Sequence, residues 1–235
     1  MELRDKYPKF AASMMCANLK DLIKTIEIFE KYDIDYLHID VMDGEFVPNL
    51  GIGVDYINAL REITSIPLDL HLMIKNPEYK IQWLDIREKD IVTVHIESTH
   101  HIHRALKEIS KTPARKFIAI NPGTPVIYIE ELIASIDGVN VLAVDPGFAG
   151  QSIVRGTTEK VKRTVELVKQ LGNEKPIIEV DGNITLKNAE LFTKIGADMF
   201  VLGSSGLFTN GVDRLEDNII AFQNALFCQD LQTQD

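Results

Sequence analysis

Histidine and aspartate side chains recur where three short apolar runs of this chain end. His38 and Asp40 stand in the segment HIDVMDG, His71 in LHLM, and Asp181 in EVDG. Residues two apart in an extended strand share one face, so His38 and Asp40 point the same way. Two imidazoles and two carboxylates form a ligand set for a divalent metal. A satisfied core or loop role is the alternative at each position, and the combination of all four favours a metal site.

The remaining histidines are interpreted as structural or solvent-exposed. His95 ends another apolar run but has no acidic neighbour on its own strand face, so we expect a structural or pocket-lining role. His100, His101 and His103 follow closely at a helix start, where a solvated helix face is favoured over a metal-binding tract.

Glycine-bearing segments follow three successive apolar runs and predict a site for an anion. They are DPGFAG at 145–150, Gly182, and GSSG at 203–206. Glycines let backbone N–H groups approach a phosphate closely, and the loops after the last strands of an α/β barrel often form such a site. One glycine pair alone would be an ordinary turn. Three such loops in succession favour phosphate binding.

The charge balance limits the partners. Of 235 residues, 35 are Asp or Glu and 25 are Lys or Arg, giving a net charge of −10. Such a surface does not attract nucleic acid, and an anionic substrate must be held by local groups such as backbone dipoles. Two cysteines without metal or redox spacing suit a reducing compartment. With no apolar run of signal-peptide or membrane length, we expect a cytoplasmic protein without a membrane partner.

Short β-branched runs alternate with longer amphipathic segments along the whole chain. The runs predict strands at residues 10–15, 36–41, 68–73, 91–95, 116–120, 139–144, 176–180 and 199–202. Several are apolar throughout, as strands covered on both faces are. Eight strand–helix units of about 29 residues each fit one (β/α)8 TIM barrel, an α/β fold, over residues 1–235. An open doubly wound sheet is the alternative, and residues 229–235 form a polar tail that is expected to fray.

Apolar periodicity predicts two helices in detail. The first covers residues 18–31 and shares one apolar face among Leu19, Leu22, Ile23, Ile26 and Phe29. The second covers residues 158–170, stops at Gly172, and buries Val161, Val165 and Val168. In a barrel, functional residues belong at strand C-termini and in the loops that follow.

Four segments give the chain a resemblance to a known family. They are HIDVMDGEFVPN at 38–49, LDLHLM at 68–73, VDPGFAGQ at 144–151 and EVDG at 179–182. In length and order they resemble the ribulose-phosphate 3-epimerases, and the match runs over nearly the whole chain. The resemblance implies an isomerase on a TIM barrel of ribulose-phosphate-binding type, with a sugar-phosphate substrate and a homo-oligomeric assembly.

The resemblance also implies roles for individual residues. His38, Asp40, His71 and Asp181 would bind one divalent cation (Zn, Mn, Fe or Co), without an organic cofactor. Asp40 and Asp181 would be the acid–base catalysts, one on each face of the substrate. The other implied residues would contact the sugar, pack around the reacting carbons or hold the phosphate: Ser13, Met42, Met73, Gly147, Phe148, Ala149, Gly150, Gly182, Asn183, Gly203 and Ser204.

Epimerisation at C3 of a 2-keto sugar phosphate needs the chemistry that these residue types supply. The carbonyl acidifies the C3–H bond, and a divalent cation would stabilise the charge of the resulting enediolate. Inversion requires a proton to leave from one face and another to arrive at the opposite face. Two carboxylates on opposite sides of the substrate meet that requirement.

Several positions depart from the ribulose-phosphate pattern and concern the substrate. The departures are Met14, Met15, Cys16, Asn18, Leu142, Ala149, Asn183 and the segment at 205–207. The Met-Cys pair, GFAGQ and the SGLF ending are more similar to the D-allulose-6-phosphate 3-epimerase branch. We therefore expect interconversion of D-allulose 6-phosphate and D-fructose 6-phosphate. The alternative is D-ribulose 5-phosphate to D-xylulose 5-phosphate, as in the pentose phosphate pathway.

Two other function classes compete with an epimerase. A lyase or decarboxylase on a similar barrel often needs a strand-end lysine, and Lys75 is the candidate, although Asn76-Pro77 beside it indicates a loop or helix entry. A non-catalytic sugar-phosphate sensor would keep the barrel without the chemistry, and the presence of all four ligand types argues against it.

Overall fold

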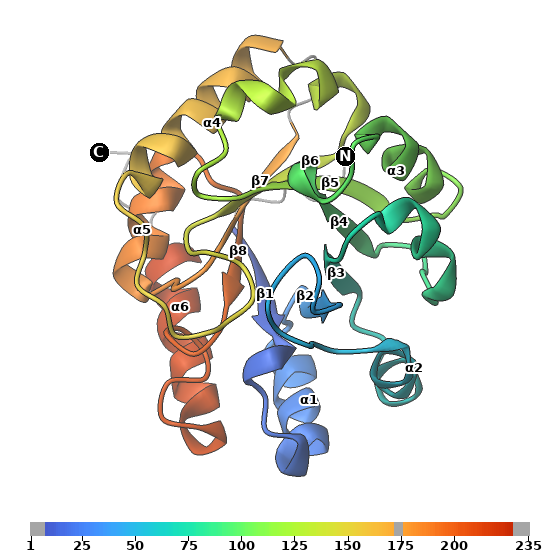
Figure 1. Cartoon of the computed structure of the whole chain (residues 1–235). Helices are drawn as coiled ribbons and strands as arrows, with labels where there is room; N and C mark the ends of the chain where they lie inside the picture. The colour runs from blue at the N-terminus through green and yellow to red at the C-terminus, as the bar shows by residue number, and fades with distance from the viewer. Residues whose placement is uncertain (1–7, 172–175, 228–235) are drawn as a thin grey trace.

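Eight parallel strands close into a barrel in the computed structural model, which describes residues 8–171 and 176–227. Each strand pairs with its neighbours in chain order and β8 pairs with β1, so the sheet has no edge (Figure 1). The strands are β1 (Lys9–Ser13), β2 (Tyr36–Met42), β3 (Leu68–Met73), β4 (Ile91–His95), β5 (Arg115–Ile120), β6 (Gly138–Leu142), β7 (Ile177–Asp181) and β8 (Met199–Leu202). The predicted (β/α)8 barrel is confirmed, and the open sheet is excluded.

Helices surround the barrel, as Figure 1 shows. Among the described residues, six are α-helical: α1 (Leu22–Lys31), α2 (Val54–Ile63), α3 (Ile102–Ile109), α4 (Thr157–Leu171), α5 (Leu186–Ile195) and α6 (Leu215–Phe227). The helices of the described chain also include 3-10 helices: η1 (Met14–Cys16), η2 (Leu19–Asp21), η3 (Pro77–Tyr79), η4 (Ile81–Trp83), η5 (Ile96–Ser98), η6 (Val126–Ser135) and η7 (Val212–Arg214). Within residues 8–171 and 176–227, no helix has the length and apolar character needed to cross a membrane.

The strand–helix alternation is less regular than predicted after β3 and β5. After β3 the chain forms the 3-10 helices η3 and η4, and after β5 it forms η6, where the prediction expects α-helices. Before η3, Asn76 takes a left-handed conformation (φ 48°) and Pro77 cannot donate a backbone hydrogen bond, so the turn is tight. The η6 segment carries β-branched Val126, Ile127 and Ile129, which disfavour a regular α-helix.

The two helices predicted in detail show one error and one agreement. The chain enters α1 only at Leu22, after η2, and the side chains of Leu19 and Ile23 are exposed, so assigning both to the apolar face was wrong. Ile26 and Phe29 of α1 are buried as expected. In α4, the predicted valines Val161, Val165 and Val168 are buried. The stop at Gly172 and the tail at 229–235 lie outside the described residues.

The barrel interior changes from apolar to polar toward the strand C-termini. At the N-terminal end, a cluster that includes Tyr36, Ile91, Phe117, Ile177 and Met199 fills the space between the strands. Two residues further along their strands, buried polar side chains replace it: His38, Thr93 and Glu179, accompanied by Asp69 and Asn140. Buried polar groups need partners. The polar layer therefore forms the floor of the site above it.

Candidate metal centre and active site

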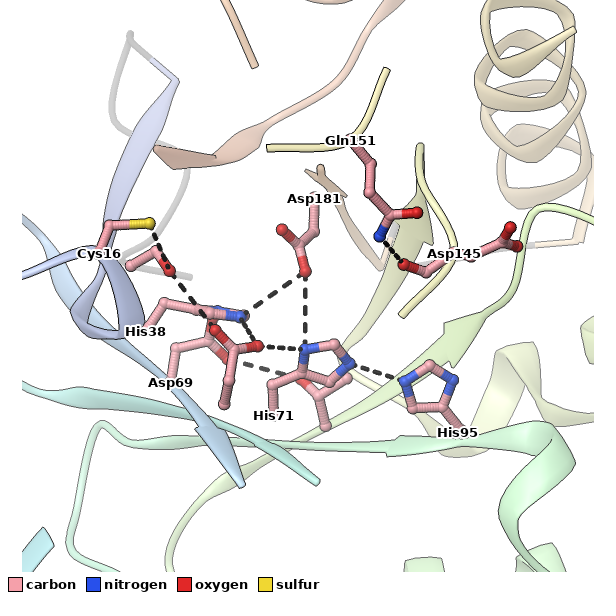
Figure 2. Close-up of polar contacts among 11 residues, drawn as sticks. Cys16, His38, Asp69, His71, His95, Asp145, Gln151 and Asp181 are labelled. Carbon is pink, nitrogen blue, oxygen red and sulfur yellow. Dashed lines mark hydrogen bonds and ion pairs between the residues drawn. The ribbon is translucent and has the colours of Figure 1, made fainter. Parts of the chain in front are cut away.

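The strand register places the four predicted ligand residues together at the C-terminal mouth of the barrel. In the parallel pairing of β2 with β3, Asp40 lies opposite His71, and Asp181 ends β7 opposite Leu142 of β6. His38 Nε2 lies 3.3 Å from Asp40 Oδ1 and 3.7 Å from Asp181 Oδ2. His71 Nδ1 lies 3.2 Å and 3.6 Å from the same two oxygens. Figure 2 shows Asp181 reaching both imidazoles.

These separations fit a divalent cation. One ligand atom from each of His38, Asp40, His71 and Asp181 lies within 4.8 Å of all the others. Donors about 2.1 Å from a tetrahedral metal are about 3.4 Å from one another, and the four distances bracket that value. Imidazole and carboxylate donors suit Zn, Mn, Fe or Co. The donor set thus fits the predicted cation.

The two carboxylates stand in different electrostatic environments. Burial raises the pKa of Asp40, but the charges and hydrogen bonds of His38 and His71 outweigh it and hold the pKa well below its usual range. Burial and the nearby charge of Asp40 raise the pKa of Asp181, although His38 and His71 oppose that shift. A dication bound by the two carboxylates would lower both pKa values.

An aspartate that the sequence analysis did not single out holds the first ligand histidine. Asp69 Oδ2 lies 2.5 Å from Nδ1 of His38, so Nε2 of that ring faces the ligand cluster. Both carboxyl oxygens of Glu179 are buried without a hydrogen-bond donor among the described residues. Burial and the charge of Asp69 raise the pKa of Glu179 well above its usual range. Asp69 precedes His71 by two on β3, so the alternation that marks His71 marks this residue as well.

His95 has a structural place beside the second ligand histidine. The ring is fully buried, and Nε2 lies 2.7 Å from Nε2 of His71 (Figure 2). His95 does not line the cavity, and its expected structural role stays a prediction; β4 itself offers it no acidic neighbour, but Glu97 beyond the strand places Oε2 3.3 Å from Nδ1. Glu97 falls in η5, where strand alternation no longer applies. Burial lowers the pKa of His95 to about 4, so the ring is neutral at pH 7.

A cavity opens above the ligand cluster, and most predicted substrate-binding residues line it. Lining residues include Ser13, Asp40, His71, Met73, Gly147, Phe148, Ala149, Gly150, Asp181, Gly182, Asn183, Gly203 and Ser204. His38 lies beneath the cavity wall and is fully buried. Met42 is also absent from the lining and packs with Met73 and Val47 instead. Ser13 Oγ lies 3.4 Å from Asp40 Oδ2, so this hydroxyl can donate to the carboxylate oxygen turned away from the imidazoles.

The glycine-containing loops after β6, β7 and β8 form one side of the cavity. Gly182 has φ +109°, and a Cβ at this position would lie 2.7 Å from Val144, so only glycine fits. The loop after β6 is tied down by Asn49 Nδ2, which donates to the Gly147 carbonyl at 2.7 Å. Gln151 Nε2 donates to the carbonyl oxygens of Asp145 and Phe148. The loops after β6, β7 and β8 therefore face one cavity.

The remaining sequence candidates lie outside this arrangement. Lys75 is not among the residues that line the cavity, and its ammonium lies 5.9 Å from the centroid of the Phe46 ring. His100, His101 and His103 are exposed around the start of α3, as predicted. The position of Lys75 removes the residue on which a Schiff-base lyase would depend.

Comparison with known proteins decides the family. The family model described as "Ribulose-phosphate 3 epimerase family" matches residues 9–208. The chain belongs to this family. It is 39% identical over 195 residues to the chloroplastic ribulose-5-phosphate-3-epimerase of Arabidopsis thaliana, covering 82% of this chain and 69% of that one. It is 37% identical over 197 residues to the ribulose-phosphate 3-epimerase of Bacillus subtilis, covering 84% and 91% of the two chains.

As a member of the ribulose-phosphate 3-epimerase family, the protein is an epimerase, in the isomerase class of enzymes. The fold is shared more widely. KGPDC from Streptococcus mutans superposes with a TM-score of 0.67 at 14% identity, covering 93% of this chain and 97% of that one. At this identity the likeness shows the barrel alone.

The positions that depart from the usual family pattern gather at the cavity. Met15, Cys16, Leu142, Ala149, Asn183 and Ser205 all line it. Asn183 keeps a left-handed conformation (φ 51°), which asparagine tolerates better than most residues other than glycine. Leu207 is fully buried and lies outside the lining. Most departures thus lie where a substrate would be in contact with them.

Proposed function

We propose that this epimerase inverts C3 of a ketose phosphate with one divalent cation held by His38, Asp40, His71 and Asp181. The observation that carries the proposal is the set of four ligand atoms within 4.8 Å at the base of the cavity. A bound divalent cation would supply Lewis-acid stabilisation of the negative charge that develops when C3–H is deprotonated.

Asp40 and Asp181 would exchange protons with C3 from two sides. They come from β2 and β7, which are separated by β8 and β1 around the barrel. One carboxylate would remove the C3 proton from one face, and the other, as the acid, would deliver a proton to the opposite face. Ser13 would hold the second oxygen of Asp40 at the 3.4 Å contact. A single base would return the proton to the face from which it came.

Different walls of the cavity would bind the two ends of the substrate. Met73 and Met15 contribute apolar side chains beside the ligand cluster and make no hydrogen-bond demand on the reacting carbons. Met42 would support this wall from behind through its packing with Met73. The glycine loops at 147–150, 182–183 and 203–204 would hold the phosphate through backbone N–H groups, as a protein with a net charge of −10 requires.

The favoured substrate pair is D-allulose 6-phosphate and D-fructose 6-phosphate. Most of the expected departures from the pentulose pattern line the cavity, which supports a role in substrate choice over neutral drift in outlying loops. The second candidate is D-ribulose 5-phosphate to D-xylulose 5-phosphate. It is supported by the relatives, which are named ribulose-phosphate 3-epimerases at 37–39% identity.

Metal removal tests the proposal. Dialysis of the purified protein against a chelator should abolish C3 epimerisation, and adding back Zn, Mn, Fe or Co singly should restore it. His71→Ala should lower metal content as well as turnover, whereas His103→Ala, an exposed histidine on α3, should change neither. Full activity in the metal-free protein would contradict the proposal. Full metal content in His71→Ala would remove that residue from the ligand set.

Two accompanying predictions concern the cell and the assembly. We propose that the protein acts in the cytoplasm and forms a homo-oligomer. Sparse cysteines support the first, and the resemblance to the family supports the second. Light scattering coupled to size-exclusion chromatography measures the assembly directly.

A further inference from the structure

A chain of three side chains runs outward from the ligand cluster through β4. His71 turns Nδ1 toward Asp40 and Asp181, and Nε2 lies 2.7 Å from Nε2 of His95. The two rings are nearly parallel, with centroids 4.9 Å apart and an interplanar angle of 18°. The other ring nitrogen of His95 lies 3.3 Å from Oε2 of Glu97. His95 thus connects His71, through Nε2, to Glu97, through Nδ1.

Donor and acceptor rules assign the protons along this chain. A neutral histidine that binds a metal through Nδ1 carries its proton on Nε2. Two N–H groups cannot face each other at 2.7 Å, so Nε2 of His95 must be the acceptor. The single N–H of His95 is then on Nδ1, where it meets the carboxylate of Glu97, which only accepts. Glu97 therefore selects the protonated nitrogen of His95, and His95 selects that of His71.

Glu97 is fixed for this task by its other oxygen. Oε1 accepts from the backbone N–H of Asn121 at 2.9 Å and from the hydroxyl of Thr124. Both donors belong to the loop after β5, so the carboxylate is held between that loop and His95. Phe46 covers His95, with ring centroids 4.7 Å apart. A fully buried imidazole packed against the tilted Phe46 ring has little room to rotate to another partner.

We propose that His95 and Glu97 are positioning residues that hold His71 with its Nδ1 lone pair directed at the metal site. The inference rests on the proposed metal site. It gives the two ligand histidines different supports: Asp69 holds His38 directly, while Glu97 acts on His71 through a second imidazole. Hydrogen bonds to the outer nitrogen of a ligand histidine orient the ring and raise its affinity for the metal.

The substitution Glu97→Gln tests the chain without changing side-chain volume. If the amide oxygen of the substituted side chain keeps the contacts with Asn121 and Thr124, its NH2 group faces Nδ1 of His95 and requires a lone pair there. The N–H of His95 then moves to Nε2 and opposes the N–H of His71. We expect metal affinity, measured by competition with a chelator, to fall about tenfold or more.

Glu78→Gln is the matched control. Glu78 is also a buried acid, and it accepts a hydrogen bond from Thr99 at 2.8 Å without a contact to the ligand histidines. We expect wild-type metal affinity for this variant. An unchanged metal dissociation constant in folded Glu97→Gln would overturn the inference. Failure of the wild-type protein to bind metal would instead overturn the proposed function.

A measurement on the wild-type protein decides the matter even if Glu97→Gln does not fold. Long-range 1H–15N spectra of the Zn-loaded, 15N-histidine-labelled protein report which ring nitrogen carries each proton. The expected pattern is protonation of His95 at Nδ1 and of His71 at Nε2. Protonation of His95 at Nε2, or at both nitrogens, would overturn the inference.

Discussion

At the scale of single residues, Asp40 and Asp181 carry the proposed chemistry. Asn at either position keeps the size of the side chain and one oxygen but cannot act as a base. Asp40→Asn and Asp181→Asn should each lower kcat by about 100-fold or more, with the fold retained by circular dichroism. Turnover above a few per cent of wild type in either folded variant would remove that residue from the catalytic pair.

The two variants should also differ from each other. A protein that keeps only one carboxylate can still remove and return the proton on one face. We expect each variant to exchange the C3 proton of one epimer with solvent and not of the other, as followed by NMR in D2O. The epimer that exchanges identifies the face that the remaining carboxylate serves.

Strand alternation, together with the convergence of strand ends in a barrel, was sufficient to predict that His38, Asp40, His71 and Asp181 lie close together. It places His38 with Asp40, and it also marks Asp69, which the prediction did not include. The partner of His95 is different. Glu97 lies beyond the strand in η5, so its approach to His95 depends on a turn that alternation does not describe. Contacts across such turns require the structure.

At the scale of elements, the loop after β2 positions part of the site. Asp43 anchors this loop by accepting from the backbone N–H groups of Glu45 and Phe46 and, from the neighbouring segment after β3, from the backbone N–H of Lys75 and from Lys80 Nζ. The anchored loop supplies Phe46, which covers His95, and Asn49, which donates to Gly147. The loops after β2 and β6 are therefore held together over the site.

Removing the Asp43 charge should weaken this anchor. Asp43→Asn should lower the free energy of unfolding at pH 7 by about 1–3 kcal/mol, because several donors lose a charged acceptor. Urea unfolding measures this difference. Asp213→Asn is the control: its ion pair with Lys24 is exposed, and we expect almost no change.

The difference in free energy of unfolding between wild type and Asp43→Asn should also depend on pH. Burial raises the pKa of Asp43, but the hydrogen bonds from Lys80, Phe46, Lys75 and Glu45 outweigh it and hold the pKa well below its usual range. A carboxyl with a lowered folded-state pKa contributes stability that is fully present above its unfolded value of about 4 and is lost as the pH falls toward the folded value. The difference in free energy of unfolding between wild type and Asp43→Asn should therefore become smaller below about pH 4. A gap that stays constant from neutral pH down to about pH 3.5 would contradict this account of Asp43.

Element types were predicted less evenly than strand positions. Every predicted strand is present, with its ends displaced by two residues at most, because buried β-branched runs are unambiguous. The segments after β3 and β5 follow local turn chemistry at Asn76 and Pro125 instead of the general alternation. Leu19 and Ile23 match a helical apolar period, yet both are exposed: Leu19 precedes α1, and Ile23 lies on a part of α1 that the period alone does not show to be uncovered.

At the scale of the whole molecule, closure of the barrel sets the distance between the ligand cluster and the glycine loops. Sequence alone left an open sheet as an alternative, and it could not show that residues 98 positions apart, Asn49 and Gly147, meet over the site. Those long-range contacts determine which loops face the cavity. The length of substrate that the site accepts therefore depends on the assembled barrel.

Substrate length gives a prediction at this scale. Hexulose and pentulose phosphates differ by one CHOH unit between the reacting carbons and the phosphate, so one barrel cannot fit both equally well. We expect kcat/KM for D-allulose 6-phosphate to exceed that for D-ribulose 5-phosphate under one metal and buffer. The ratio of the two kcat/KM values should be large if the site forms a hydrogen bond with the extra hydroxyl of the hexulose phosphate, and small if the pocket merely has room for it. A value for D-ribulose 5-phosphate about tenfold or more above the other would assign the protein to pentulose phosphates.

The fate of the C3 proton tests the central claim most directly. With wild-type protein and either ketose phosphate in D2O, we predict that the epimeric product carries deuterium at C3 from its first appearance, since the delivered proton comes from a carboxyl that has exchanged with solvent. Proton NMR of the C3 position follows this during the first turnovers. Formation of the epimer with its original C3 hydrogen would contradict two-carboxylate proton transfer and require another route to inversion.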